Sequence, residues 1–167
     1  VYDVKDSCLR ATPFASPMNR ECEKNWAFTH NKKGDLRIIY EWSPLTIATT
    51  NLITNTLDHL QTNTNVPTFF KDLRGSSNGC IYKDEVWFLC HLVHHRSPRE
   101  YYHIMVVLDA ETLTYKRHSI LFKLKGESIE FSLSMVVEEE RFLITYSCFD
   151  RTSFLLELPR GVEKLLF

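Results

Sequence analysis

The segment "EVWFLCHLV" (Glu85–Val93) decides the fold class, because its composition is that of a central β-strand. Side chains alternate along a strand, so one face carries Trp87, Leu89, His91 and Val93, and the other carries Phe88, Cys90 and Leu92. Both faces are apolar except at His91, whose imidazole needs a hydrogen-bonding partner in such surroundings. His91 is therefore predicted either as a core histidine or as a ligand-facing residue near the axis of a propeller.

Two other segments follow the same order of a turn, an apolar strand and a polar strand end: "LRIIYEWSP" (Leu36–Pro44) and "RFLITYSCFD" (Arg141–Asp150). The three lie about fifty residues apart, and four-stranded sheets repeated radially at such a period describe a β-propeller. Further short strand patterns are "LTIATT" (Leu45–Thr50), "GCIY" (Gly79–Tyr82), "YHIMVVLD" (Tyr102–Asp109), "YKRHSILF" (Tyr115–Phe122), "IEFSLSMVV" (Ile129–Val137) and "SFLLELP" (Ser153–Pro159). Because tight connections favour antiparallel meanders, we predict an all-β, antiparallel, propeller-like fold of about three blades.

The remaining segments have no clear strand pattern. Residues 1–20 are polar and interrupted by Pro13 and Pro17, which predicts an irregular arm or loop. Asn51–Lys71 is rich in Thr and Asn, and it is predicted as a long loop or as one or two helical turns. Residues 21–167 are predicted to form the blades of a single domain, which is incomplete because a closed propeller needs more chain.

The composition narrows the choice of partners. The chain has 167 residues, with 20 Lys and Arg against 21 Asp and Glu. Without a basic excess we predict no nucleic-acid partner, and without a long apolar run we predict no membrane insertion. The five cysteines are odd in number and show no C-x-x-C spacing, so no metal site or cofactor is predicted. Buried free thiols are favoured over disulfides, which favours a reducing, cytoplasmic location.

Several polar residues are candidates for a binding site. In "EKNW" (Glu23–Trp26) the charged pair and the amide form either a salt-bridged turn or the rim of a site for a polar ligand. In "KDLRGSSNG" (Lys71–Gly79) Arg74 lies in either a simple turn or an anion-binding loop. Asp150 is either a turn aspartate or a carboxylate that accepts hydrogen bonds from sugar hydroxyls.

Two further patterns can be interpreted from strand geometry. Glu130 is flanked by apolar residues, and it is predicted to face solvent or a polar cavity because a lone buried charge is costly. "HHRSPREYYH" (His94–His103) is predicted as a basic hairpin tip. A metal site there is disfavoured, because adjacent strand residues point to opposite faces.

Taken in order, four segments resemble the mannoside phosphorylases of glycoside hydrolase family 130: "EKNWAF…GDLRIIYEWSP", "RGSS…VWFLCHLV", "YYHIMVVLDAETLTYKRHSILF" and "IEFSLSMVVEEERFLITYSCFD". They are also similar to related propellers found beside glycosyltransferases in bacterial and viral proteins. The resemblance runs from Glu21 to Pro159. It implies part of a five-bladed β-propeller that acts on β-mannosides, with inorganic phosphate or water as the attacking species.

The resemblance also implies roles for individual residues. Lys24 and Asn25 match the family's Arg-Asn pair, although Lys keeps the charge and loses the bidentate fork. His91 matches the histidine of the family's "YHG" segment, Glu130 the acidic residue of its "YE" segment, and Asp150 the aspartate ending its "YYGAAD" segment. The resulting phosphate-binding residues are Lys24, Asn25 and His91. The substrate-binding residues are Glu130, Asp150 and Arg74.

Two features of the family are missing from this sequence. The general acid lies in an "EDPR" segment that this chain lacks, and the family's phosphate-binding lysine falls near Tyr82, where there is no proline run. A phosphorylase needs both an acid and a cationic site for phosphate. No catalytic residue is therefore assigned, and if the protein is an enzyme, its acid must come from a segment preceding Val1.

The sequence leads to two functional hypotheses. The first is a carbohydrate-active propeller portion that acts on or binds mannoside-like glycans, with inorganic phosphate as co-substrate. The alternative is a non-catalytic interaction, glycan-binding or assembly module with a degenerate site. The expected partners are a glycan or oligosaccharide, and further propeller blades or a glycosyltransferase domain.

Overall fold

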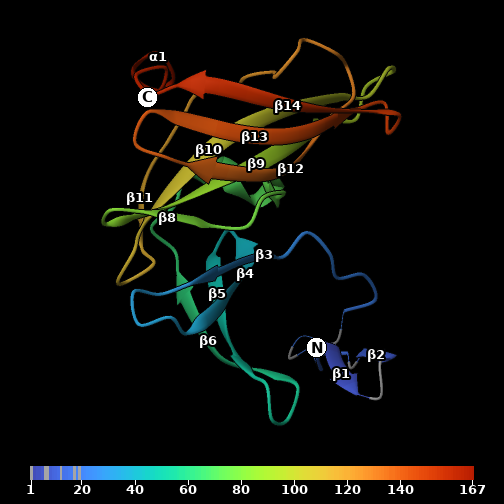
Figure 1. The fold of residues 1–167 in the computed structure, drawn as a ribbon, viewed down its shortest axis with the longest axis vertical. Helices are drawn as coiled ribbons and strands as arrows, with labels where there is room; N and C mark the ends of the chain where they lie inside the picture. Colours follow the sequence, from blue (N-terminus) through green and yellow to red (C-terminus); the bar gives the residue numbers. More distant parts are fainter. Residues whose placement is uncertain (1, 6–7, 12, 17, 19) are drawn as a thin grey trace.

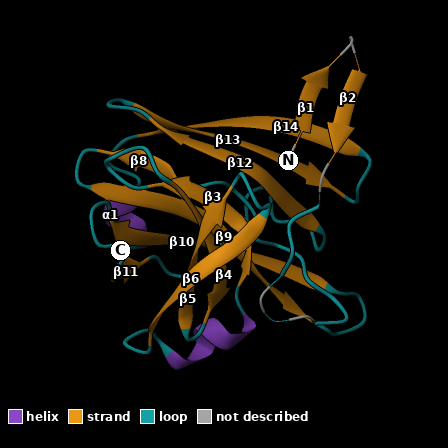
Figure 2. Ribbon diagram, turned by 90° about the horizontal axis from the view of Figure 1, so that it is seen from below, coloured by secondary structure: helices purple, strands orange, loops and turns teal. Residues whose placement is uncertain are grey.

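The computed structural model describes residues 2–5, 8–11, 13–16, 18 and 20–167. Strands make up most of it, and besides a two-stranded hairpin near the N-terminus they form three antiparallel sheets that follow one another along the chain (Figures 1 and 2). The first sheet contains β3 (Ala27–His30), β4 (Leu36–Trp42), β5 (Leu45–Asn51) and β6 (Thr56–Asn63). The second contains β7 (Arg74–Gly75), β8 (Cys80–Tyr82), β9 (Glu85–His94), β10 (Glu100–Asp109) and β11 (Tyr115–His118). The third contains β12 (Glu130–Val137), β13 (Arg141–Cys148) and β14 (Thr152–Pro159).

This arrangement confirms the prediction of an all-β, antiparallel, propeller-like fold. Strands that follow one another in the chain are neighbours in the first and third sheets, as expected for meanders with short turns, and in the second sheet β7 and β8 both pair with β9. The three segments with a shared pattern are β4, β9 and β13, which each occupy the second position in their sheet. The approximate fifty-residue period therefore reflects one sheet per repeat.

Two predictions of irregular structure were wrong. Residues 1–20 contain a hairpin of β1 (Tyr2–Lys5) and β2 (Cys8–Ala11), in which Tyr2 pairs with Ala11. The segment 51–71 contains β6 and a short 3-10 helix, η1 (Thr68–Asp72). β6 is the outermost strand of the first sheet and most of its side chains are exposed. An outer strand of this kind buries no continuous face, so it lacks the apolar alternation that would have predicted it.

The core lies on both sides of the second sheet, which Figure 1 shows between the other two sheets. Phe88 and Cys90 of β9 pack in the cluster shared with the first sheet. Trp87 and Leu89 pack in the cluster shared with the third sheet, near the short helix α1 (Glu163–Leu166). The alternation predicted for β9 is confirmed, and this strand contributes to both halves of the core.

The segment "RGSSNG" (Arg74–Gly79) forms an interrupted inner strand, and not the turn or loop that was predicted. β7 and β8 both pair with β9, and between them Ser77 exchanges hydrogen bonds with the backbone of Leu89. The two glycines allow this strand to lie close to the first sheet. A Cβ on Gly75 would lie 2.6 Å from the Asn25 carbonyl oxygen, and one on Gly79 would lie 2.7 Å from Thr29 Oγ1 of β3.

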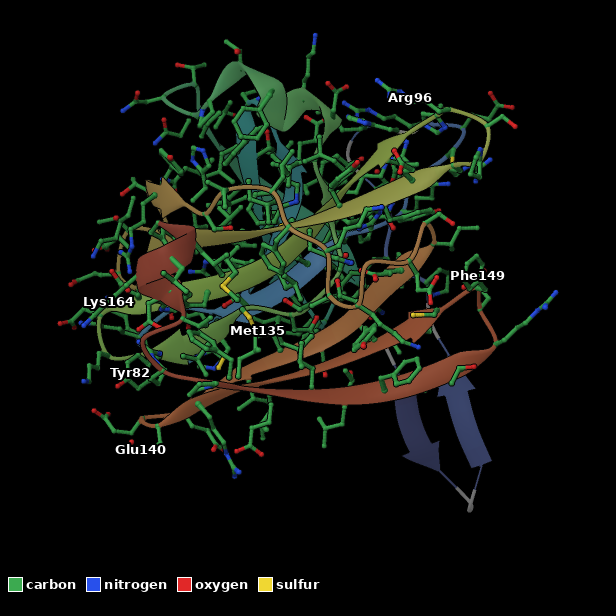
Figure 3. All side chains as sticks on the ribbon, turned by 90° about the horizontal axis from the view of Figure 1, so that it is seen from above. Tyr82, Arg96, Met135, Glu140, Phe149 and Lys164 are labelled. Atoms are coloured by element: carbon green, nitrogen blue, oxygen red, sulfur yellow. The ribbon has the colours of Figure 1, made fainter. Side chains whose placement is uncertain are left out.

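The strand directions place all six predicted site residues at one end of the sheets. Lys24 and Asn25 precede β3, and Arg74 and Glu130 begin inner strands. His91 is paired with Arg74 in the second half of β9, and Asp150 lies just beyond β13. Arg96 and Phe149, in the β9–β10 and β13–β14 turns, mark this end in Figure 3, and Tyr82, Glu140 and Lys164 mark the opposite end. We call the end that carries the six predicted site residues the Arg96 end.

Candidate functional site

A cavity of about 240 Å³ opens between the first and second sheets at the Arg96 end. Three of the six predicted site residues line it: Lys24, Asn25 and Arg74. Lys24 and Asn25 come from the segment before β3, whereas Arg74 is the first residue of β7. The close approach of the two inner strands at Gly75 brings these distant segments together.

The segment "EKNW" is anchored through Glu23. Its carboxylate accepts hydrogen bonds from Ser16 Oγ at 2.5 Å, Tyr40 Oη at 2.6 Å and the Arg20 backbone N–H at 3.3 Å. Burial acts to raise the pKa of Glu23, but these hydrogen bonds together lower it below its ordinary value. Glu23 is therefore ionised at neutral pH, and it is bonded to groups other than Lys24.

Asn25 adopts a backbone conformation that few residues tolerate. Its φ is 61°, in the left-handed region that asparagine enters more readily than most residues. Its carbonyl faces Gly75, and its side chain is half-buried beside the cavity. Asparagine suits this position because it tolerates the left-handed backbone conformation and because its amide borders the cavity.

The charges that line the cavity are mostly positive. Lys24, Lys71 and Arg74 contribute three cations, and Glu41 contributes a carboxylate that is paired with Arg20. Within the described residues no carboxylate lies within 4 Å of the three cations. A polar or anionic ligand would find unpaired donors here.

Trp42 is a neighbour of the cavity that the sequence did not indicate. Its ring is buried and packs edge-on against Phe88, with centroids 5.3 Å apart. It also lines the cavity, and its Nε1–H has no hydrogen-bond partner among the described residues. Buried indole N–H groups usually have a partner, but this one is itself enclosed, so Trp42 borders the cavity without opening its N–H to it.

His91 lies apart from this cavity, on the side of β9 that faces the third sheet. Its Nδ1 is 2.6 Å from Ser76 Oγ, and its ring lies against Tyr101 and Phe131. Burial, followed by the charges of His103 and Arg74, lowers its pKa to about 4. His91 is therefore neutral at pH 7, and Ser76 supplies the partner that a core histidine requires.

The prediction that Glu130 faces solvent or a polar cavity was wrong. The residue is fully buried, and its carboxylate accepts hydrogen bonds from the backbone N–H groups of Leu124 (2.7 Å), Lys125 (2.8 Å) and Glu127 (2.8 Å). Three backbone donors compensate a buried carboxylate for the loss of water. The sequence could not indicate them, because they come from the loop that precedes β12.

His103 was predicted as part of the basic hairpin tip, but it is fully buried within β10 and is a neighbour of Glu130. Its Nε2 is 3.7 Å from Glu130 Oε2, and neither ring nitrogen has a hydrogen-bond partner among the described residues. Burial lowers its pKa to about 4, against the opposing attraction of Glu130. His103 lies in β10 directly opposite His91, and this pairing depends on the strand register, which the sequence did not give.

Asp150 is exposed in the turn between β13 and β14. Its φ of 52° and that of Phe149 lie in the left-handed region, which aspartate tolerates in turns. It shares the Arg96 end with the cavity but does not line it. The structure thus brings three predicted residues together, places His91 and Glu130 between the second and third sheets, and leaves Asp150 on a turn.

Metal-ligating side chains, free thiols and apolar helices are the other features that could indicate a function. No group of three or more His, Cys, Asp or Glu side chains is arranged to hold a metal ion. Cys22, Cys80, Cys90 and Cys148 are free thiols, and Cys90 and Cys148 are buried as predicted. In this part of the chain no helix has the length and apolar character needed to cross a membrane.

Comparisons with known proteins give a likeness in fold. No protein-family model and no curated protein matches the chain. A glycosyl hydrolase from Bacteroides ovatus matches 83% of this chain and 49% of its own, with a TM-score of 0.57 and 11% identity. A second structure, described as a glycoside hydrolase, matches 84% of this chain and 33% of its own, with a TM-score of 0.49 and 12% identity. The chain therefore spans about half the length of the first hydrolase, with which it shares an all-β fold.

Proposed function

We propose that this chain binds mannoside-like glycans in the cavity between the first and second sheets. The observation that supports the proposal is the convergence of Lys24, Asn25 and Arg74, which come from two sheets and line one cavity. Amide and cationic side chains donate hydrogen bonds to sugar hydroxyls and to anionic oxygens. Trp42, Phe70 and Leu73, which are buried, form an apolar wall beside them, and such a wall suits the less polar faces of a sugar ring.

The cavity supports binding more directly than catalysis. Glycoside cleavage requires an acid to protonate the leaving oxygen, and usually a second carboxylate. Among the residues that the structure describes, Glu41 is the only carboxylate lining this cavity, and it is paired with Arg20. An enzyme of the mannoside phosphorylase type would need an acid from residues beyond those that line the cavity, with inorganic phosphate as the co-substrate.

Calorimetry with manno-oligosaccharides tests the proposal. Asn25→Gly keeps the left-handed backbone accessible and removes the amide, so affinity is expected to fall by roughly 2–10-fold with folding retained. Lys24→Ala is expected to lower the affinity to a similar or greater extent. Asp150→Asn serves as the control at the same end of the sheets. Equal affinity for the unchanged protein and Asn25→Gly would contradict the site, and loss in Asp150→Asn would extend it toward the third sheet.

A second measurement separates binding from turnover. β-Mannosides are incubated with the protein, with and without inorganic phosphate, and released sugar or sugar phosphate is measured. We expect retention of the glycan without turnover by this chain. Phosphate-dependent release would instead support the phosphorylase hypothesis, and absence of both binding and release would leave the interaction-module hypothesis.

A further inference from the structure

A second cavity of about 210 Å³ adjoins the first at the Arg96 end. Lys71 and Arg74 line both cavities, so they stand at the junction. His94 and His95 border the second cavity from the end of β9, together with Asp72 of η1. The sequence predicted a binding role for Arg74 but for none of Lys71, Asp72, His94 and His95.

The junction has an excess of positive charge. Within the described part of the chain, neither Lys71 nor Arg74 has a carboxylate within 4 Å or a side-chain hydrogen bond. Of the carboxylates in the described ranges, Asp72 alone lines the second cavity. Arg74 is half-buried, and its strand partner His91 is neutral at pH 7 because its pKa is about 4. A half-buried guanidinium without a counter-ion favours the binding of an anion.

The fold holds these groups in defined positions. Arg74 is paired with β9 in the strand ladder, and the next residue, Gly75, lies against the Asn25 carbonyl. Lys71 occupies the last turn of η1, where a cation interacts favourably with the free carbonyl groups. Leu92 and Val93 supply an apolar wall on the β9 side. The backbones of β7 and η1 therefore fix the positions from which Arg74 and Lys71 extend, although the Lys71 side chain is exposed.

We propose that the second cavity receives an anionic substituent of the glycan whose neutral ring occupies the first cavity. The substituent is a phosphate ester, a sulfate ester or a uronate carboxylate, since all three present oxygens that accept hydrogen bonds from Lys71 and Arg74. This inference rests on the proposed function, because it names the chemical class of the glycan. Arg74 can contact both parts of the ligand, and its planar fork suits a tetrahedral ester or a carboxylate.

Calorimetry with matched ligands tests the inference. A neutral manno-oligosaccharide is compared with its 6-phosphate and 6-sulfate forms and with an oligosaccharide of the same length that contains a uronic acid. We expect at least one charged form to bind roughly tenfold or more tightly than the neutral form at low salt. This advantage should decrease as sodium chloride is added. The three charged ligands identify which substituent is recognised.

Three lysine variants test whether the advantage of the charged ligand depends on the junction. Lys71→Ala should remove most of the preference for the charged ligand with little effect on the neutral one, whereas Lys33→Ala, the same charge change in the β3–β4 turn, should leave it intact. Lys71→Arg should retain it. Equal affinity for neutral and charged forms, or a preference that survives Lys71→Ala, would overturn the inference while the proposed function stands.

Failure of the proposed function would give a different result. If no oligosaccharide binds, inorganic phosphate and sulfate are titrated while the NMR signals of His94 and His95 are followed. Saturable shifts that disappear in Lys71→Ala would support an anion site in the second cavity without a glycan. The absence of such shifts would overturn the inference together with the proposed function.

Discussion

Polar residues differ in exposure and in charge between the two interfaces that separate the sheets. Between the first and second sheets, Lys24 and Arg74 border an open cavity and have no carboxylate partner among the described residues. Between the second and third sheets, His91, His103 and Glu130 occupy the same end but are buried, and the histidines are uncharged at pH 7. Residues at the same end of the sheets therefore border a candidate ligand site in one interface and are part of the buried core in the other.

Replacement of Glu130 is the most severe test of this comparison. Glu130→Ala would leave three part-buried backbone N–H groups without their acceptor, at about 1 kcal/mol each, so we expect a loss of about 3 kcal/mol in the free energy of unfolding. Urea unfolding measures the change, with exposed Glu140→Ala as the control. A stable variant that loses only glycan binding would show that Glu130 is a ligand-binding residue after all.

The second test uses pH, because it distinguishes buried from exposed histidines. His91 and His103 have pKa values of about 4 in the folded protein, below the ordinary 6.5 of the unfolded chain. The unfolded chain therefore binds more protons between these values, so stability is complete above pH 6.5 and decreases as the pH falls toward 4. Each histidine accounts for a loss of up to about 3 kcal/mol over that range.

Urea unfolding at several pH values between about 5 and 7.5 checks this, above the range in which most carboxylates titrate. The double variant His91→Gln/His103→Gln should lose most of the slope of stability against pH. Exposed His94→Gln should keep it. An unchanged slope in the double variant would show that these imidazoles are not the source of the dependence.

The smallest of the three effects concerns the first interface. Gly75→Ala would place a Cβ 2.6 Å from the Asn25 carbonyl oxygen, so the inner strands must separate at a cost of about 1–3 kcal/mol. Glycan affinity should fall as well, because the cavity depends on this close approach. The comparison variant is Gly34→Ala, where a Cβ would meet nothing within 4 Å and only the φ of 85° opposes it. Equal melting temperatures for Gly75→Ala and the unchanged protein would contradict the close contact.

The sequence predicted the strands that are buried on at least one side. β4, β9 and β13 have long apolar runs, and β9 in particular has two apolar faces that the structure confirms. β6 and the β1–β2 hairpin could not be predicted in this way, because the sequence shows no apolar alternation there. Secondary structure at the edges of sheets depends on backbone pairing that leaves little trace in composition.

The candidate site was harder to predict than the fold. The resemblance indicated Lys24 and Asn25, but their proximity to Arg74 depends on the spacing of two inner strands, which is set by Gly75. Lys71 and the Trp42 indole were missed because nothing in their own segments marks them as neighbours of the cavity. The burial of Glu130 was not predicted, because its hydrogen-bond donors are backbone N–H groups whose positions cannot be read from a sequence.

The burial of β9 on both sides couples the two halves of the molecule. Arg74 and His91 are directly paired across β7 and β9, so the cavity and the buried histidines share one hydrogen-bonded ladder. Neither interface can separate without removing apolar contacts from the same strand. We therefore expect the three sheets to unfold as a single cooperative unit, and a ligand held in the cavity to protect amide hydrogens as far away as the third sheet.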